Sequence, residues 1–101
     1  MKFEEFWASL VTNLKTNHDF VTLTQGKPFE ARNAIAAIVI TPESTGYKRV
    51  IKKDEFRKIW NMAKTFSDEQ VYNTSNYQKD SVNISYIFTL IKHVIGDKKL
   101  E

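Results

Sequence analysis

The stretch ITPESTGYKRVIKKDEF, residues 40–56, contains a strand end, a turn, a second strand and the start of a helix. An apolar run ends at Pro42, which has no N–H to donate to a neighbouring strand. Residues 43–46 are typical of a turn, and the strand 47–51 then returns antiparallel to the first. Asp54 and Glu55 suit the positive N-terminus of a helix. The stretch therefore predicts a β-hairpin that leads directly into a helix.

Two further strands are predicted before this hairpin. Residues 20–24 are β-branched and aromatic, residues 25–28 (Gln-Gly-Lys-Pro) are typical of a turn, and residues 29–32 complete a hairpin. The apolar run 34–41 lacks a clean alternation of polar and apolar residues. We therefore expect it to form a central strand that is covered on both faces.

Apolar residues recur at helical spacing in three segments, residues 3–14, 54–66 and 84–95. The polar segment 67–81 shows no period, and its fifteen residues are many for a structureless loop, so part of the segment is either ordered or functional. The order α-β-β-β-β-α-α predicts an α+β fold. We expect a single domain, residues 1–101, in which an N-terminal helix and two C-terminal helices pack on a small antiparallel sheet of three to four strands.

The composition excludes several classes of protein. With 42% hydrophobic and 13% aromatic residues, the chain is too apolar to be disordered. It has no cysteine, which excludes a disulfide scaffold and a thiolate nucleophile and fits a reducing compartment. The N-terminus lacks the apolar segment of a signal peptide, and no run approaches the roughly 18 apolar residues that cross a bilayer. We therefore expect a cytoplasmic protein with no membrane partner.

No catalytic or metal-binding motif is present. The two histidines, His18 and His93, are far apart in the sequence, and the glycine-rich phosphate, dinucleotide and serine-hydrolase motifs are missing. Asp54, Glu55 and Lys58 have the residue types of a metal-dependent nuclease. However, they lie on a helix at a spacing that does not fit the strand motif of such enzymes. We predict no enzymatic activity, no catalytic residue, no metal and no cofactor.

Positive charge is concentrated in one part of the sequence. Between Glu43 and Lys64 there are seven Lys and Arg residues and three acids, an excess of +4, so the rest of the chain sums to −1. Clustered cations bind phosphates, and exposed aromatic rings stack on bases. The hairpin 44–53 is therefore a predicted nucleic-acid-binding site. Its candidate residues are Ser44, Tyr47, Lys48, Arg49, Lys52 and Lys53.

An alternative interpretation of this hairpin is purely structural. Side chains alternate along a strand, which places Lys48 and Lys52 on one face and Arg49 on the other. A single basic surface then requires a bulge, a twist or a neighbouring loop. Lysines also protect exposed sheet edges against pairing with other chains, so the basic strand is alternatively a solvated edge.

The polar segment 67–81 is a second candidate surface. Its residues Tyr72, Asn76 and Tyr77 are of types that make adaptable polar contacts and stacking surfaces. If the segment lies beside the basic hairpin, the two form one recognition surface. The alternative is that both tyrosines pack on the sheet and hold a long loop in place.

Three segments together resemble a small bacterial α+β domain of unassigned activity. They are TLTQGKPF (22–29), IVITPESTGYKRVIKKDEFRKIW (38–60) and NISYIFTLI (83–91). Domains of this kind occur alone on mobile elements such as gene cassettes and beside nuclease or restriction-type domains. The resemblance implies a context near DNA-directed defence, and its shared positions are Gly26, Lys27, Ser44, Gly46, Lys48, Arg49, Ser85 and Tyr86.

These observations leave two functional hypotheses of different classes. The first is a non-enzymatic module that contacts nucleic acid through the hairpin. The second is a protein–protein interaction module or a homodimer, because the high aromatic content and three apolar helical faces leave room for a partner-binding face.

Overall fold

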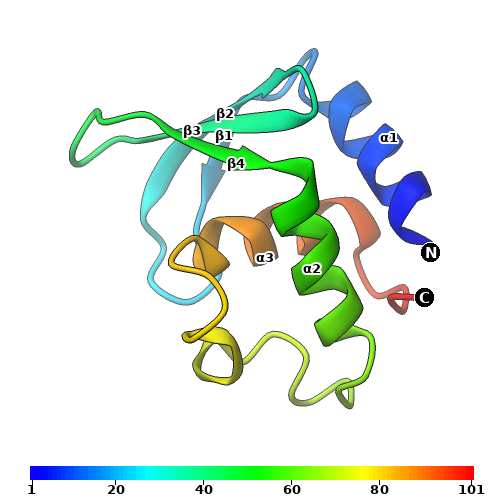
Figure 1. The fold of residues 1–101 in the computed structure, drawn as a ribbon. Coiled ribbons are helices and arrows are strands. Elements are labelled where there is room, and N and C mark those ends of the chain that lie inside the picture. Colours follow the sequence, from blue (N-terminus) through cyan, green and yellow to red (C-terminus); the bar gives the residue numbers. More distant parts are fainter.

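A computed structural model describes residues 1–101 of the chain, and its ribbon is shown in Figure 1. In chain order the elements are α1 (Phe3–Asn13), β1 (Asp19–Val21), β2 (Pro28–Ala34), β3 (Ala37–Pro42), β4 (Arg49–Lys52), α2 (Lys53–Ala63), the short 3₁₀ helix η1 (Thr74–Tyr77) and α3 (Ile84–Ile95). The predicted α+β class and the predicted order of helices and strands are confirmed. None of the helices combines the length and the apolar character needed to cross a membrane.

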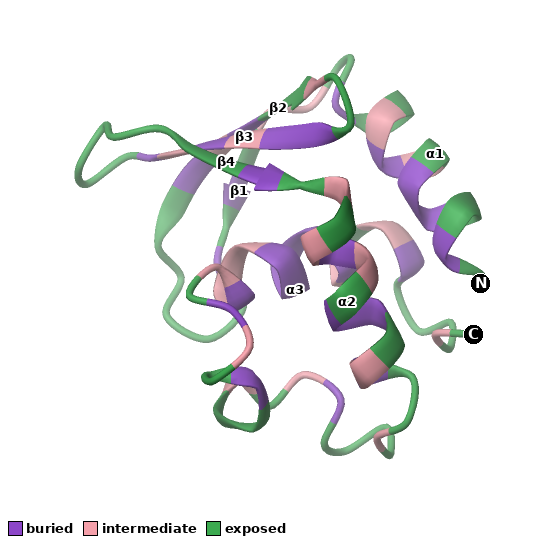
Figure 2. Ribbon diagram, viewed as in Figure 1, coloured by how far each residue is buried: buried purple, intermediate pink, exposed green.

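The four strands form one antiparallel sheet in the order β1-β2-β3-β4. Phe20 pairs with Phe29, and Ile38 pairs with Ile51; these residues are buried and define the inner face, on which the helices pack. The neighbouring positions point the other way, because side chains alternate along a strand. On this outer face Arg32 pairs with Val39, which in turn pairs with Val50. Figure 2 shows a buried residue between exposed ones in β1 and in β4, whereas the residues of the interior strand β3 are buried or intermediate.

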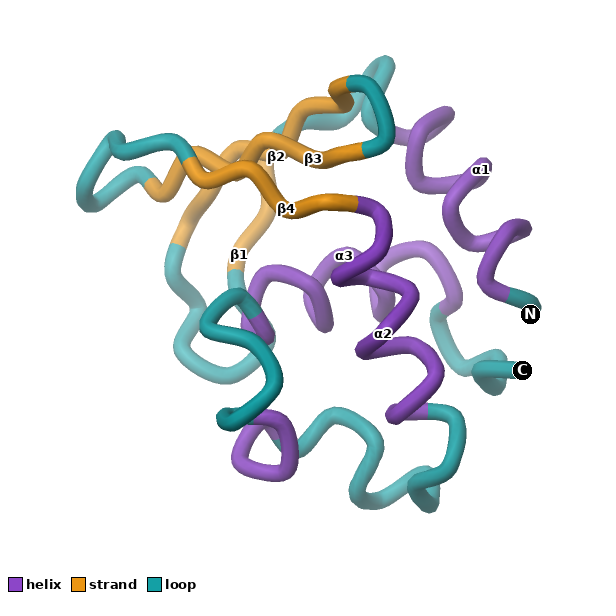
Figure 3. Tube along the Cα trace, viewed as in Figure 1, coloured by secondary structure: helices purple, strands orange, loops and turns teal.

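The prediction that residues 34–41 form a strand covered on both faces is wrong. The run is interrupted by a two-residue turn, Ile35–Ala36, in which Ile35 is 99% exposed and Ala36 has a positive φ of 50°. β3 begins only at Ala37, and the outer face carries no helix (Figure 3). Since apolar residues occupy both the turn and the strand here, composition did not distinguish one from the other.

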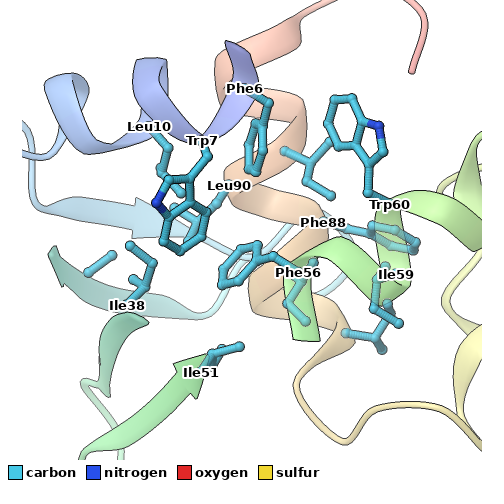
Figure 4. Close-up of a cluster of buried hydrophobic side chains, with 14 of the residues drawn as sticks. Phe6, Trp7, Leu10, Ile38, Ile51, Phe56, Ile59, Trp60, Phe88 and Leu90 are labelled. Atoms are coloured by element: carbon cyan, nitrogen blue, oxygen red, sulfur yellow. The ribbon is translucent and has the colours of Figure 1, made fainter. Parts of the chain in front are cut away.

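Aromatic side chains join α1 and α2 over the inner face. The rings of Phe6 and Trp60 stack with centroids 5.1 Å apart, and Trp7 meets Phe56 edge to face at 5.3 Å (Figure 4). Each such pair contributes about 0.5–1.5 kcal/mol beyond the burial of its area. They belong to one core of 23 buried residues, which includes the inner side chains of the sheet and the apolar stripe of α3.

The polar segment 67–81 is ordered over much of its length. Tyr77, in η1, is wholly buried and its hydroxyl donates a hydrogen bond to the carbonyl oxygen of Val71 at 2.9 Å. Its ring meets that of Phe88 on α3 edge to face, with centroids 4.7 Å apart. The segment is therefore held mainly by α3, and not by the sheet.

Candidate nucleic-acid interface

The connection between β3 and β4 projects away from the three helices (Figure 1). Its backbone is fixed by two short-range hydrogen bonds, from the Gly46 N–H to the carbonyl of Pro42 at 2.8 Å and from the Tyr47 N–H to Oγ1 of Thr45 at 3.2 Å. Gly46 has a φ of +69°, a conformation that glycine adopts without steric cost. The hairpin tip therefore has a defined backbone on which its side chains are displayed.

The arm of the hairpin that leads into and forms β4 has four exposed residues, which we call the β4 strip: Tyr47 and Lys48 just before the strand, and Val50 and Lys52 on its outer face. Tyr47 is 80% exposed, and Val50 is 62% exposed. Lys48 and Lys52 are exposed, and the structure shows no hydrogen bond or ion pair to either ammonium group. Ser44 is exposed nearby in the turn. Four of the six predicted residues thus lie in or beside an open surface with two free cations.

Arg49 points to the inner side of the sheet instead. Its Nη1 donates to Oδ1 of Asn83 at 3.4 Å, and its guanidinium lies 5.5 Å from the ring centroid of Tyr86 on α3. Because Ile51 on the same side is fully buried, the predicted separation of Arg49 from the two lysines is confirmed. Arg49 links the hairpin to α3 and does not extend the β4 strip.

Lys53 is also directed elsewhere, because it lies in the first turn of α2. Its Nζ is 3.1 Å from a carboxylate oxygen of Glu4 and 5.7 Å from the ring of Trp7, both on α1. Arg57 approaches the same carboxylate at 3.2 Å. Hydrogen bonds from Lys53 and Arg57 lower the pKa of Glu4, against the opposing effect of desolvation. The assignment of Lys53 to the binding surface is therefore corrected: it joins α2 to α1.

The positive charge that is clustered in the sequence is dispersed in the fold. The ammonium group of Lys58 donates to the carbonyl of Asp80 at 3.3 Å. Lys64 follows the C-terminal end of α2, roughly 16 Å of helix from its start. There it lines an open cavity of about 630 Å³, whose other basic residues are Lys92, Lys98 and Lys99. The excess of +4 is thus not a single patch.

The outer face carries negative charge in a groove that reaches from β1 to the start of the β3–β4 connection. A groove of about 560 Å³ over β1, β2 and β3 is lined by the acids Asp19, Glu30 and Glu43. Glu30 accepts a hydrogen bond from Arg32 at 2.8 Å, which lowers the pKa of Glu30. The outer face therefore has an acidic groove over β1 to β3 and basic residues at β4, close enough that the charge of Lys48 also lowers the pKa of Glu30. Sequence reasoning missed this arrangement, although the alternate positions of the strands contain the signal.

The second predicted surface, made of Tyr72, Asn76 and Tyr77, does not form. Tyr77 is buried, and Tyr72 packs edge to face on Phe88 at 5.5 Å. Burial raises the pKa of both tyrosines to about 12. Asn76 is exposed, but its amide donates to the carbonyl of Gln70 at 3.3 Å. The alternative interpretation, in which the tyrosines hold the loop, fits the structure, with α3 as the surface they pack on.

Tyr72 is also far from the hairpin along α3. The ammonium group of Lys92, in the last turn of the helix, lies 5.2 Å from the ring of Tyr72, whereas Arg49 contacts Asn83 and Tyr86 at its start. The loop around Tyr72 and the hairpin therefore do not make one recognition surface.

A hydrogen-bonded group that sequence reasoning did not identify holds the base of the hairpin. Oε2 of Glu55 on α2 accepts hydrogen bonds from the hydroxyl of Ser81 at 2.6 Å and from the amide of Asn83 at 3.1 Å. The other side of the Asn83 amide accepts from Arg49. These contacts connect α2, the start of α3 and β4, and they set the direction in which the hairpin projects. Ser81 and Asn83 are 26 and 28 positions from Glu55, so no local sequence pattern indicates these contacts.

The structure contains no group of three or more His, Asp and Glu side chains that is arranged to hold a metal ion. Comparisons of the chain with protein-family models, with curated proteins and with solved structures give no match. The geometry of the hairpin is therefore the basis for a functional proposal.

Proposed function

We propose that this protein is a non-enzymatic module that binds nucleic acid through the β3–β4 hairpin. The observation that supports the proposal most directly is the β4 strip, which combines an exposed tyrosine with two exposed lysines that make no hydrogen bond or ion pair. Phosphate groups are bound by clustered cations, and base rings stack on exposed aromatic side chains. A projecting hairpin presents both kinds of group at once to an extended ligand.

Each part of the hairpin has a role in this proposal. Lys48 and Lys52 contact phosphates, and the hydroxyl of Ser44 adds a hydrogen bond of the kind that positions a backbone. Tyr47 offers its ring for stacking. Arg49 and Lys53 act indirectly, because their contacts to α3 and α1 hold the hairpin in its orientation.

The resemblance to small domains of mobile elements adds a context to the proposal. Such a module would act in the cytoplasm, close to DNA-directed defence or to the movement of a gene cassette. This context suggests the setting in which the protein would encounter nucleic acid. The binding chemistry proposed for the hairpin does not depend on that setting.

The proposal is tested by neutralising the two lysines. We expect Lys48→Gln/Lys52→Gln to lose most of the binding to a labelled oligonucleotide in a fluorescence anisotropy titration at low salt. The matched control is Lys15→Gln/Lys79→Gln, which removes the same charge from two exposed lysines elsewhere. The control should bind like the parent. Equal losses in both variants, or no binding by the parent, would overturn the proposal.

The outer face of the sheet favours a second candidate function, association with another copy of the chain. It is bare of helices, it exposes Val21 by 57% and Val50 by 62%, and its acidic and basic halves are complementary. Two such faces related by a two-fold axis along the strands bring the acids of one copy over the lysines of the other. Sedimentation velocity at two protein concentrations distinguishes this dimer from a monomer.

A further inference from the structure

Building on the proposed function, we infer that the hairpin selects single-stranded over double-stranded nucleic acid, by stacking one unpaired base on Tyr47. The inference depends on three features of the surface: how Tyr47 is held, how few cations surround it, and where the outer face becomes negative.

Tyr47 has the geometry of a stacking platform. Its ring contacts none of the other aromatic rings and is 80% exposed, whereas the ring of Tyr86 on α3 is in contact with Phe29 and Arg49. The backbone of Tyr47 is nevertheless fixed, since its N–H donates to Thr45 beside the ordered turn at Gly46. With the backbone fixed, only the two side-chain torsions of Tyr47 lose freedom when a base stacks on its ring. A base must be unpaired and unstacked to make this contact, so duplex DNA cannot provide it.

The number of free cations is too small for tight binding to a duplex. Non-specific duplex binding comes almost entirely from phosphate contacts, and strong binders make about 6–10 of them. The β4 strip has two cations, Lys48 and Lys52, which are four residues apart and thus separated by roughly 13 Å along the strand. Stacking on Tyr47 therefore has to contribute a large share of the affinity, and only a single strand offers it.

The acidic groove limits the path of the ligand. Asp19 and Glu30 lie on the β1 side of the outer face and Glu43 lies at the start of the β3–β4 connection, and these acids repel a phosphate backbone. A flexible single strand can follow the narrow edge at β4 and avoid the groove. A duplex is wider and stiffer, so its second strand is brought toward the acids. Duplex binding is therefore weakened twice, by repulsion from the acids of the outer face and by the lack of a stacking contact.

The experiment compares single-stranded and double-stranded oligonucleotides of one sequence in the same anisotropy assay. We expect the parent to bind the single strand more tightly than the duplex. Tyr47→Ala should weaken single-strand binding by about 5- to 150-fold, the effect of losing one stacked base, and should leave duplex binding unchanged. Tyr47→Phe keeps the ring and should retain the single-strand affinity. Because Tyr47 makes no core contact, the unfolding temperature of both variants should match that of the parent.

The outcomes separate the inference from the proposed function. If Lys48→Gln/Lys52→Gln weakens binding but Tyr47→Ala does not, the hairpin binds phosphates and the inference is wrong. Equal affinity of the parent for the single strand and the duplex also overturns the inference while leaving the proposed function in place. If neither nucleic acid binds the parent, both are wrong. A loss confined to the single strand in Tyr47→Ala, with rescue by Tyr47→Phe, supports the inference.

Discussion

Two tyrosines of the segment 67–81 should differ in how much their replacement by phenylalanine changes the free energy of unfolding. The hydroxyl of Tyr77 donates a hydrogen bond to the carbonyl of Val71 at 2.9 Å within the core. The hydroxyl of Tyr72 is also buried, but it has no hydrogen-bond partner. Tyr→Phe removes only the hydroxyl from each side chain and keeps its ring against Phe88. The pair of variants therefore isolates the hydrogen bond from the packing.

The expected magnitudes follow from these contacts. Tyr77→Phe leaves a buried carbonyl without its donor, which costs about 1–2 kcal/mol of the free energy of unfolding. For a domain of this size the loss lowers Tm by roughly 4–16 °C. Tyr72→Phe removes a buried polar group that is not satisfied in the parent. Its free energy of unfolding should therefore be unchanged or higher.

The assay is urea unfolding followed by the fluorescence of Trp7 and Trp60, both of which are buried. A fall in stability of similar size in both variants would refute the assignment of hydrogen bonds in the segment 67–81.

The ionisation of the two tyrosines gives a second test. Burial raises the pKa of both tyrosines to about 12, above the ordinary value of 10.0. Because the unfolded chain therefore loses these protons first, the free energy of unfolding falls as the pH rises from about 10 to about 12. Spectrophotometric titration should show two tyrosines that ionise late.

Three further predictions concern the contacts that hold the hairpin and α2. Glu55→Ala removes the acceptor of the Ser81 hydroxyl and should lower the free energy of unfolding by about 2–3 kcal/mol. Glu55→Gln keeps an oxygen at this place and should lower it by less than half as much. Equal losses of the two variants in urea unfolding would contradict this. Glu4 has a pKa below its ordinary value of 4.5, so its pair with Lys53 stabilises the fold above that pH and is lost as the pH falls through its folded pKa. The stabilities of the parent and Glu4→Gln should therefore differ at neutral pH and converge in acid. Gly46→Ala places a side chain at a φ of +69° and should lower the stability by about 1–2 kcal/mol, measured by thermal unfolding.

The elements of the fold were predictable because their signals are local. Helical spacing of apolar residues identified α1 and α3, and turn residues around Pro42 and Gly46 marked the hairpin. The turn at Ile35 was missed, because its apolar residues do not differ in kind from those of the strand that follows. Local patterns thus located the elements better than their ends.

The candidate site was only partly predictable, since exposure depends on residues that are distant in the sequence. Lys53 belongs to the basic run, yet its partner Glu4 lies 49 positions away on α1. Strand alternation correctly separated Arg49 from Lys48 and Lys52, but the contact of Arg49 with Asn83 depends on the position of α3. A count of charges along the sequence does not distinguish free cations from paired ones. The structure reduces the candidate surface to the β4 strip.

The salt dependence of binding to single-stranded DNA tests the proposed role of the β4 strip most directly. Two phosphate contacts predict a slope of about −1.4 in a plot of log K against log salt concentration, so a fourfold rise in salt weakens binding by about 7-fold. Lys48→Gln/Lys52→Gln should reduce the slope to nearly zero, whereas Lys15→Gln/Lys79→Gln should leave it unchanged. A slope that Lys48→Gln/Lys52→Gln does not alter, or the absence of any binding, would contradict the assignment of these two lysines as the phosphate contacts.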